Sequence, residues 1–500
     1  MMLYLFLFFV GLLFVYIKFQ YFTLRGPIPG LSPHFFFGNL IQTGLLSGRR
    51  VSSEVYILLN GQFGDIYQYW LGFIHFVVVH NIDDVQYILS HRNIYDQGQI
   101  FLEKFSILVP NSIICNIGAK FKRHGAFAMP LFRRSKIISN INIVIDGTDK
   151  LLDRWRARPT GQVHTDVVEQ CQNLLLEIFG LIAFDYDLET LDGNDSGNKN
   201  ELTKALRDIM SIFRMIIYAP NIVSTVYLKL SPKYRRASAT VERYLHRMVE
   251  QELAETPDSR LQRKKTSLIA SLVSSLQADE PAEARKKEAE KKGLSRKELF
   301  DEMLMFLIAG YETTSTALAW CIYQLSKNPR VQQKLKTELM QDASSQSLTV
   351  DRVDSFIYLD CFINEVLRYS PTIDGTSRSV VVDDYLPKSG TRLYKGDQVL
   401  IPTSALSRDT RFWKIDAEQF YPERFLNEDK NHHPCALLPF GGGHRQCLGQ
   451  DLARFELKVI LARMLQQVTF VDGGSEVNAG GFSQTLTIIP KHVGVTVEFH

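Results

Sequence analysis

The chain has 500 residues, of which 45% are hydrophobic and 22% charged, a balance that excludes a disordered protein. This length allows one very large domain or two smaller ones. The formal net charge of +3 lies too near zero to indicate nucleic-acid binding, so we expect no nucleic-acid partner.

Residues 1–22, MMLYLFLFFVGLLFVYIKFQYF, are apolar apart from Lys18 and Gln20. A helix needs about 20 such residues to cross a bilayer, so this segment predicts a transmembrane anchor. A cleaved signal peptide matches less well, because a charged start and a small-residue cleavage site are not clear, and a buried core helix is the other alternative. Lys18 and Arg25 follow the span, which predicts a single-pass anchor with the rest of the chain in the cytosol.

The six cysteines of the chain would then lie in a reducing compartment, where structural disulfides are disfavoured. Their positions lack the clustered spacing that is typical of zinc sites. We therefore expect at most one of them to take part in chemistry.

The segment at 23–50 follows the anchor and begins with the motif RGPIPG. Its two prolines fix φ and its glycines permit a turn, so we expect a stiff hinge that sets the globular part against the membrane. Residues 63–80, FGDIYQYWLGFIHFVVVH, are aromatic and β-branched with a glycine break, which predicts a β-hairpin or meander. The following DDVQYILSH returns to helical spacing.

The rest of the chain is mainly helical in pattern and shows no internal repeat. Apolar residues recur at helical spacing over 296–345 and 449–467, whereas 373–403 reads as short strands and turns. Two polar segments, 187–200 and 277–293, are expected to be a loop and a solvated charged run. The sequence thus predicts a mainly α fold with a minor β-sheet region, with residues 51–500 as one large domain.

The segment at 299–327, LFDEMLMFLIAGYETTSTALAWCIYQLSK, is apolar nearly all round and predicts a central buried helix. Its middle carries Glu312, Thr313 and Thr314, and burying such groups without partners costs on the order of 2–7 kcal/mol per neutral group. In one interpretation the threonines bond the i−4 carbonyls and Glu312 meets a cation. In the other, Gly310 opens room for a ligand while the acid and the alcohol pass protons into a dry cavity. A second transmembrane span fits less well, because Glu312 would lie near the bilayer centre.

Two further motifs point to one ionic cluster. Glu365 and Arg368 in INEVLRYSP are three residues apart and share a helix face, where an ordinary surface pair would contribute under about 1 kcal/mol. The motif FYPERF at 420–425 has aromatic residues that would pin a loop to the body, although a plain turn is the alternative. We expect Arg424 of this loop to join Glu365 and Arg368 in a buried triad.

The motif FGGGHRQCLG at 440–449 places one cysteine inside a glycine-rich loop, immediately before an amphipathic helical segment. The glycines permit tight or positive-φ backbone on both sides of Cys447. A cysteine just before a helix N-terminus lies at the positive end of the dipole, which favours its thiolate form and makes it a good metal ligand. The pattern also fits a reactive nucleophile, although no His/Asn partner pair is evident.

Together, in this order and separation, these motifs resemble those of the cytochrome P450 family of haem-thiolate monooxygenases, microsomal type. The family's haem loop, Phe-x-x-Gly-x-Arg-x-Cys-x-Gly, is matched at Phe440, Gly443, Arg445, Cys447 and Gly449. Its oxygen-activation motif is matched at Ala309, Gly310, Glu312, Thr313 and Thr314. Its Glu-x-x-Arg pair falls on Glu365 and Arg368, and its Pro-Glu-Arg-Phe loop on residues 422–425. The likeness runs from the hinge to the C-terminus and is thin over about 140–295.

The resemblance implies that Cys447 binds the iron of haem b (iron protoporphyrin IX) as a thiolate, which promotes O–O cleavage. It also implies that Arg445 pairs with a haem propionate, and that Arg378 does the same unless it is a simple exposed arginine. Thr313 would stand beside the reacting oxygen, and Glu312 would relay protons from solvent. The reaction would insert one atom of O2 into an apolar substrate, with electrons from NADPH passed on by a flavoprotein reductase, and with cytochrome b5 as a further partner.

One family motif, Trp-x-x-x-Arg, is missing, because Phe121 and Gly125 stand where its two haem-contacting residues are expected. Arg123 or His124 would have to substitute, or haem would be held more weakly. The same region, residues 120–136, contains six Lys/Arg and no acid, which predicts a cationic docking face for an acidic reductase or, alternatively, a basic membrane-facing patch.

The apolar segment at 211–230, SIFRMIIYAPNIVSTVYLKL, falls where this family has its substrate roof and membrane-dipping region. It therefore predicts a lipophilic substrate arriving from the bilayer of the endoplasmic reticulum. Family members that bond haem covalently and oxidise fatty-acid ends commonly carry Glu at the position of Ala309, so that subgroup is disfavoured, and sterols, terpenoids, other lipids and xenobiotics remain open. Two alternatives to a monooxygenase are a membrane-anchored haem sensor or carrier and a reductase-independent haem-thiolate isomerase.

Overall fold

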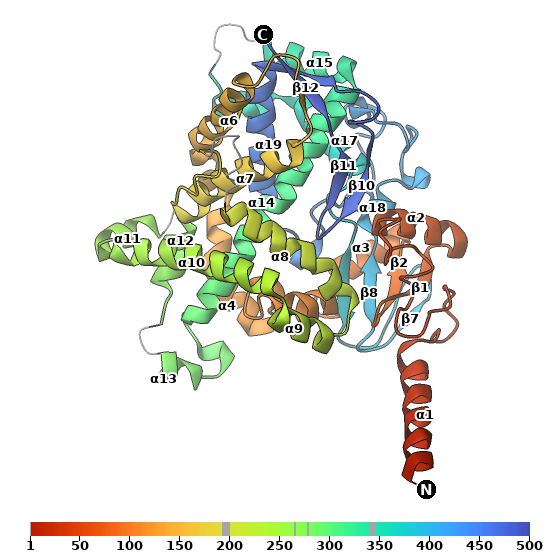
Figure 1. The fold of residues 1–500 in the computed structure, drawn as a ribbon. Helices are drawn as coiled ribbons and strands as arrows, with labels where there is room; N and C mark the ends of the chain where they lie inside the picture. The colour runs from red at the N-terminus through yellow and green to blue at the C-terminus, as the bar shows by residue number, and fades with distance from the viewer. Residues whose placement is uncertain (1, 193–200, 265–266, 278–279, 341–346) are drawn as a thin grey trace.

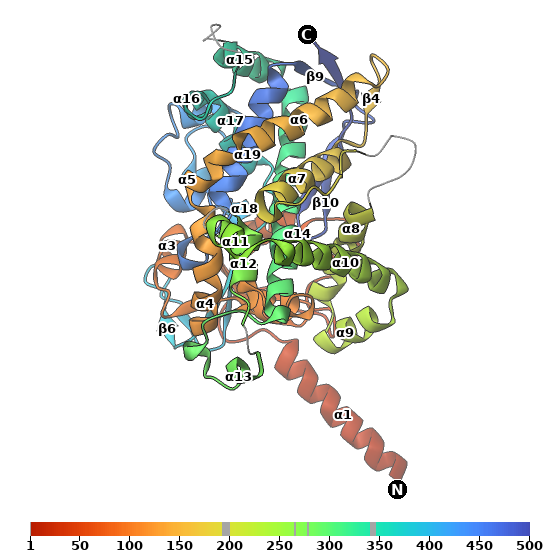
Figure 2. The ribbon, with the colours of Figure 1, turned by 90° about the vertical axis from the view of Figure 1, so that its left-hand side faces the viewer.

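The structure is a computed structural model that describes residues 2–192, 201–264, 267–277, 280–340 and 347–500. The first helix, α1 (Met2–Tyr21), projects beyond the body of the protein (Figures 1 and 2). Among the described helices, α1 over Tyr4–Tyr21 and α7 (Val167–Phe184) are long and apolar enough to cross a membrane. Most of α7 is buried inside the body, whereas none of the α1 span is, so only α1 has the exposure of an anchor or signal sequence.

The segment after α1 is fixed to the sheet. Phe22 is buried and its ring centroid lies 5.8 Å from that of Trp70. The Arg25 amide donates to Gln68 Oε1 at 2.7 Å, and the Gln68 amide donates to the Pro29 carbonyl at 2.8 Å. These contacts tie the start of the 23–50 segment to β1, so α1 leaves the body from a supported point.

The largest sheet has the strand order β1-β2-β8-β5-β3. The hairpin predicted at 63–80 is confirmed: β1 (Ile66–Leu71) pairs antiparallel with β2 (Ile74–Val79), with Ile66 opposite Val79. Every residue of β2 is buried, which explains its continuous apolar sequence. The predicted strands within 373–403 are also present; β5 (Thr376–Val380) and β8 (Gln398–Ile401) extend this sheet, which ends at β3 (Tyr95–Gln97), whereas β6 (Asp384–Tyr385) and β7 (Arg392–Leu393) pair separately.

The helical part of the body is built around α14 (Arg296–Lys327), which contains the predicted central helix. A capping box between Ser295 and Glu298 starts it, and its core packs against α7, α17 (Ile357–Tyr369) and α19 (Gln450–Leu465). The predicted segment 449–467 corresponds to α19. Figure 1 shows α14 running through the body, with the larger sheet on one side and most helices on the other. The fold is mainly helical with small sheets, as predicted.

The other α-helices surround this core. They are α2 (Ser52–Phe63), α3 (Ile82–Ser90), α4 (Gly118–Ala128), α5 (Arg134–Ile137), α6 (Ile141–Arg156), α8 (Glu201–Tyr218), α9 (Asn221–Leu230), α10 (Pro232–Ala254), α11 (Pro257–Arg263), α12 (Leu268–Ser274), α13 (Glu280–Ala284), α15 (Pro329–Met340), α16 (Val350–Ser355) and α18 (Thr403–Leu406). The remaining strands are β4 (Val163–His164), β9 (Val468–Asp472), β10 (Gly480–Gln484), β11 (Ile488–His492) and β12 (Val495–Phe499).

Two sequence expectations need comment. Residues 193–200 of the predicted loop lie outside the described residues. The run at 277–293 is not simply solvated, because it contains α13, and Glu288 accepts hydrogen bonds from the buried Arg123. Most of the described residues of this run are exposed, as predicted, and the Glu288 carboxylate in addition neutralises a cation that the fold buries.

Candidate active site

A cavity of about 410 Å³ lies beside α14. It is lined by α14, the loop before α19, the α17–β5 connection, and parts of α2, α8 and the β10–β11 turn. Several residues singled out in the sequence line it, namely Ala309, Gly310, Thr313, Thr314, Phe440, Arg445, Cys447 and Gly449. Glu312, Arg378 and Gly443 are outside this lining, and the other lining residues are mostly apolar.

The loop that carries Cys447 depends on its glycines. Gly441 and Gly443 have φ of 67° and 69°, a region that L-residues with a Cβ rarely adopt. A Cβ on Gly443 would lie 2.1 Å from the Leu89 carbonyl oxygen, so this position also needs a glycine for packing. The Cys447 amide donates to the Phe440 carbonyl at 2.9 Å and closes the loop. The result is a cysteine whose side chain opens into the cavity.

The helix N-terminus does not by itself make Cys447 a thiolate. Burial among protein atoms raises the pKa of the thiol, and the Gly449 amide opposes this to a smaller extent. The expectation from the helix dipole was therefore incomplete, because it ignored desolvation by the surrounding wall. A metal ion bound to the sulfur would reverse the balance, since a coordinating thiol is deprotonated outright.

Arg378 is buried and forms no ion pair with a carboxylate in the part of the chain that the structure describes. Its side chain is 1% exposed, so the alternative of an exposed arginine is wrong. It donates to the Thr376 hydroxyl at 2.8 Å, the Ser377 carbonyl at 2.8 Å and the Gly442 carbonyl at 3.0 Å, all of them neutral acceptors. Burial and the nearby Arg445 lower the pKa of Arg378 to about 10. A buried guanidinium in this position needs an anion to offset its desolvation.

Arg445 already has a protein anion. Its guanidinium bonds Asp96 at 2.7 Å and the Asn116 carbonyl at 3.0 Å, and it lies 3.9 Å from the centroid of the Phe121 ring. Phe121, which stands where the family motif has its tryptophan, thus packs under the arginine of the cysteine loop. Arg445 lines the cavity in this arrangement, with part of its charge taken up by Asp96.

Arg123 and His124 do not substitute for the missing motif arginine. Arg123 bonds Glu288 at 2.5 Å and Glu298 at 2.6 Å, and His124 bonds Glu302 at 2.5 Å. Neither residue lines the cavity. Both side chains are buried where α4 packs against the first turns of α14, and Glu298 and Glu302 of α14 bind them there. Sequence alone gave no sign that α14 would supply these acids.

The basic segment 120–136 is not one free cationic face. Arg123 is buried, Lys120 donates to Asn111 Oδ1 at 3.0 Å, and Arg134 pairs with Asp354. Lys122 and Arg133 remain exposed, and Lys136 is half-buried. About half of the cationic side chains in this segment are thus buried or bonded to other residues. Any docking face here is therefore smaller than predicted.

In the middle of α14, the side chains of Glu312 and Thr313 have different surroundings. Thr313 lines the cavity and donates to the Ala309 carbonyl at 2.9 Å, which is the i−4 bond that sequence analysis held open. Glu312 points to the other side of the helix, where it accepts from Thr487 Oγ1 at 3.0 Å and Gln172 Nε2 at 3.4 Å. No basic side chain among the described residues forms an ion pair with it, and burial raises its pKa. Glu312 is therefore held by neutral donors behind the cavity wall.

Gly310 has a packing role. A Cβ at this position would lie 2.3–2.6 Å from ring atoms of Phe179 on α7. The glycine lets α14 and α7 approach closely, in addition to facing the cavity. The expectation that it mainly makes room for a ligand is thus only part of its use.

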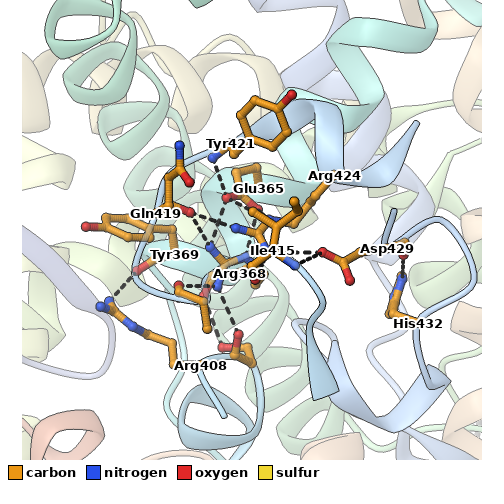
Figure 3. Close-up of polar contacts among 12 residues, drawn as sticks. Glu365, Arg368, Tyr369, Arg408, Ile415, Gln419, Tyr421, Arg424, Asp429 and His432 are labelled. Carbon is orange, nitrogen blue, oxygen red and sulfur yellow. Dashed lines mark hydrogen bonds and ion pairs between the residues drawn. The ribbon is translucent and has the colours of Figure 1, made fainter. Parts of the chain in front are cut away.

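The residues predicted as an ionic triad meet at fully buried positions (Figure 3). Arg368 donates to both oxygens of Glu365 at 2.7 and 2.9 Å, and Arg424 Nε donates to Glu365 at 3.2 Å. The two arginines also donate to backbone carbonyls of the following loop, those of Ser407, Ile415, Asp416, Ala417 and Gln419. The cluster is thus not a surface salt bridge, and it fixes the loop that leads toward the Cys447 segment.

Sequence reasoning missed part of the cavity wall. Asp374, Ser52 and Gln484 line it from three distant segments, and so does Glu456 of α19. The signal for Asp374 was an acid within the stretch PTIDG at 371–375, just before the strand that carries Arg378. Its partners lie 322 and 110 positions away along the chain, a separation that no local pattern reports.

These residues fit haem. Haem needs a ligand atom that opens into a cavity, an apolar wall for its faces and cations for its propionates. Cys447 Sγ supplies the first, the α14 and α19 walls the second, and Arg378 the third, since no carboxylate among the described residues forms an ion pair with it. Arg445 stands beside Arg378 as a second, partly neutralised cation.

Comparison with known proteins gives a consistent result. A family model described as Cytochrome P450 matches residues 28–493. The chain is 27% identical over 426 residues to Cytochrome P450 monooxygenase claP of Ampulloclitocybe clavipes, which covers 79% of this chain and 77% of that protein. It is 25% identical over 419 residues to Cytochrome P450 monooxygenase 205 of Postia placenta, covering 77% and 75%. A shorter match, 40% identical over 181 residues, relates it to Cytochrome P450 3A12 of Canis lupus familiaris, covering 36% and 35%.

Proposed function

Because this chain belongs to the cytochrome P450 family and is a monooxygenase, we propose that it inserts one atom of O2 into a lipophilic small molecule, using electrons from NADPH. A flavoprotein reductase would deliver the electrons, with cytochrome b5 as a further donor. The single observation that carries the proposal is the free side chain of Cys447, presented by a glycine-rich loop to an apolar cavity beside Thr313.

Haem b would be held by Cys447 Sγ at its iron and by Arg378 and Arg445 at its propionates, with Phe440, Gly443 and Gly449 shaping the loop. A haem bound through a cysteine thiolate supplies the electron density that favours O–O cleavage. The buried position of Arg378 supports this assignment, because a propionate would offset the cost of an isolated guanidinium. Asp96 would keep Arg445 oriented toward the same edge.

We assign proton handling to the pair in the middle of α14. The Thr313 hydroxyl donates its hydrogen bond to the Ala309 carbonyl, so its lone pairs are available to accept a hydrogen bond within the cavity. Glu312, whose pKa is raised by burial, would hold a proton behind the wall and pass it on by way of the Thr487 hydroxyl. The apolar lining keeps bulk water away from both groups.

The substrate would be a sterol, a terpenoid, another lipid or a xenobiotic that reaches the cavity from the endoplasmic reticulum membrane. Two features support a membrane route: the exposed apolar helix α1, and α9, which leaves Ile222 and Leu230 more than 70% exposed. Both helices lie at the same end of the body in the two views (Figures 1 and 2). Lys122, Arg133 and Lys136 would form the core of the reductase contact.

The test is spectroscopic and enzymatic. The purified full chain is expected to carry about one haem and, when reduced under carbon monoxide, to show the absorption band typical of thiolate ligation. Cys447→Ser should abolish that band, whereas Cys361→Ser, a buried cysteine of α17 outside the cavity lining, should keep it. NADPH consumption with added reductase and oxygenated product would separate a catalyst from a carrier. A chain that folds without binding haem, or a Cys447→Ser variant with unchanged bands, would overturn the proposal.

A further inference from the structure

The mostly apolar wall of the cavity includes the carboxyl group of Asp374, which is bonded to two other polar side chains. Asp374, in the connection between α17 and β5, accepts hydrogen bonds at Oδ2 from Ser52 Oγ and from Gln484 Nε2, the latter at 3.2 Å. All three residues line the cavity. Among the described residues, no side chain donates to the other carboxyl oxygen, Oδ1. A carboxyl group in this wall can accept further hydrogen bonds from a ligand, because each of its oxygens carries two lone pairs.

The position of Asp374 is fixed by its neighbours. Its carbonyl accepts from the Ser404 amide at 3.1 Å and the Ser404 hydroxyl at 2.9 Å. The Ser52 amide donates to Gln484 Oε1 at 2.8 Å, which connects the start of α2 to the end of β10. Three other segments, at Ser52, Ser404 and Gln484, therefore hold Asp374 in place, so its carboxyl group can orient a ligand rather than follow it.

The surroundings favour a neutral partner over a cationic one. Burial raises the pKa of Asp374, and the side chains of Tyr56 and Tyr218 lie close enough to interact with it electrostatically. Arg214 lines the same cavity and would repel a substrate ammonium group. A hydroxyl group can donate to Asp374 without bringing a second charge into the cavity.

We propose that Asp374, held by Ser52 and Gln484, accepts a hydrogen bond from a hydroxyl group of the substrate, so that the preferred substrates are lipophilic alcohols. This inference rests on the proposed monooxygenase function and narrows its substrate class. Asp374 is a substrate-positioning residue in this account: the hydroxyl group is fixed at the wall formed by α2 and β10, and the apolar remainder fills the space toward Thr313 and Cys447.

The test compares three ligands of equal chain length on the full-length haem-loaded protein in lipid nanodiscs. 1-Decanol offers a hydroxyl donor, decyl methyl ether keeps the oxygen without the donor, and N,N-dimethyldecylamine is cationic. Binding is followed by the change in haem absorption and independently by equilibrium dialysis, with empty nanodiscs as the blank. We expect the wild-type protein to bind decanol about tenfold more tightly than the ether.

Variants then assign the preference to this group. Asp374→Leu should bind alcohol and ether alike, and Asp374→Asn, which keeps an acceptor oxygen, should retain part of the preference. Asp83→Asn, at an exposed position at the start of α3, is the control and should behave like the wild type. Should Asp374→Leu fail to fold, as judged by its reduced carbon monoxide spectrum, Ser52→Ala and Asp374→Asn carry the comparison.

Two results would overturn the inference. Equal binding of alcohol and ether by the wild type would show that no hydroxyl group is recognised, while the monooxygenase proposal would stand as long as haem and product are found. Tighter binding of the amine than of the alcohol, lost in Asp374→Asn, would make the group an ammonium site. Absence of haem from the wild-type protein would instead count against the proposed function itself.

Discussion

At the scale of single residues, Thr313 and Thr314 are the polar residues of α14 that line the cavity, while Glu312 lies outside its lining. We expect Thr313→Ala to bind haem normally but to lose about tenfold or more in product formed per NADPH consumed, with hydrogen peroxide rising instead. The reason is that the variant removes the hydroxyl acceptor from the wall without changing the helix, whose backbone bonds do not depend on it. NADPH, product and peroxide are measured in the same reaction.

Thr313→Ser is the matched control for this prediction, since it keeps the hydroxyl group and removes a methyl group. It should restore most of the coupling between electron use and product. If Thr313→Ala gave wild-type product per NADPH, the role assigned to the hydroxyl would be wrong.

Glu456 gives a prediction about pH and stability. Its side chain is buried in α19 beside the cavity, its Oε1 has no hydrogen-bond partner among the described residues, and burial raises its pKa well above the usual value. Because the folded-state pKa is the higher one, the folded protein is favoured at low pH, and this contribution is lost as pH rises above about 4.5, where the unfolded chain ionises. Replacing Glu456 by glutamine, its neutral isostere, should therefore stabilise the folded protein most at high pH.

We expect the stability advantage of Glu456→Gln over the wild type to grow between pH 5 and pH 8 by up to about 1.4 kcal/mol per pH unit. Urea unfolding at several pH values measures it. Glu242→Gln, on the exposed side of α10, should show no such trend. An advantage independent of pH would mean that Glu456 gains a compensating partner when haem is bound.

The residue scale also shows what sequence can and cannot predict. The placement of Cys447, Thr313 and Arg445 around one cavity was predictable, because each belongs to a short motif whose spacing is local. The partners of those residues were not: Asp96 at Arg445, Thr487 at Glu312 and the Ser52–Asp374 contact join segments far apart in the chain. The missing anion at Arg378 likewise became visible only when its burial was known.

At the scale of elements, the buried triad joins α17 to the loop between α18 and the Cys447 segment. Arg368 makes two bonds to Glu365 and three to carbonyl oxygens, and a lysine has neither the planar fork nor the reach for these five bonds. We expect Arg368→Lys to destabilise the protein by about 3 kcal/mol or more, because it leaves buried acceptors unpaired. Loss of haem should follow, since the loop leads into the cysteine segment.

Urea unfolding and haem content measure this effect. Arg330→Lys is the control, because Arg330 is 70% exposed and its pair with Glu423 contributes little. If Arg368→Lys were as stable as the wild type, the ammonium group of a lysine would be sufficient in the cluster, and the prediction would be wrong.

Element prediction succeeded where one physical rule dominated. An all-round apolar pattern marked α14 as the central helix, and an aromatic and β-branched run marked the β1–β2 hairpin. It was incomplete at 277–293, where most of the described residues are exposed as the charges indicated, but Glu288 also neutralises Arg123. It failed for Arg123 and His124, since their orientation depends on how α4 packs against α14 rather than on either sequence.

At the scale of the whole molecule, α1 and α9 present apolar surface at one end of the body (Figures 1 and 2). The exposed apolar residues of α9 are Ile222, Val223, Val226, Tyr227 and Leu230. If both helices enter the same membrane, removing α1 alone should leave partial membrane binding through α9. The body would then be held at two points, with the 23–29 segment fixed on β1 between them.

We therefore expect a chain lacking residues 2–21 to remain partly bound to phospholipid vesicles, and the further changes Ile222→Asp and Leu230→Asp to weaken that binding by roughly 100-fold or more. The estimate follows from about 1.5–3 kcal/mol for each large apolar side chain that leaves the membrane. Vesicle flotation measures the bound fraction. Leu261→Asp with Ile357→Asp is the matched control, because these residues are 66% and 61% exposed on α11 and α17, away from the α1 end in both views. Release by the control pair as strong as release by the α9 pair would show that general acidity, rather than the α9 face, determines binding, and the two-point attachment would have to be abandoned.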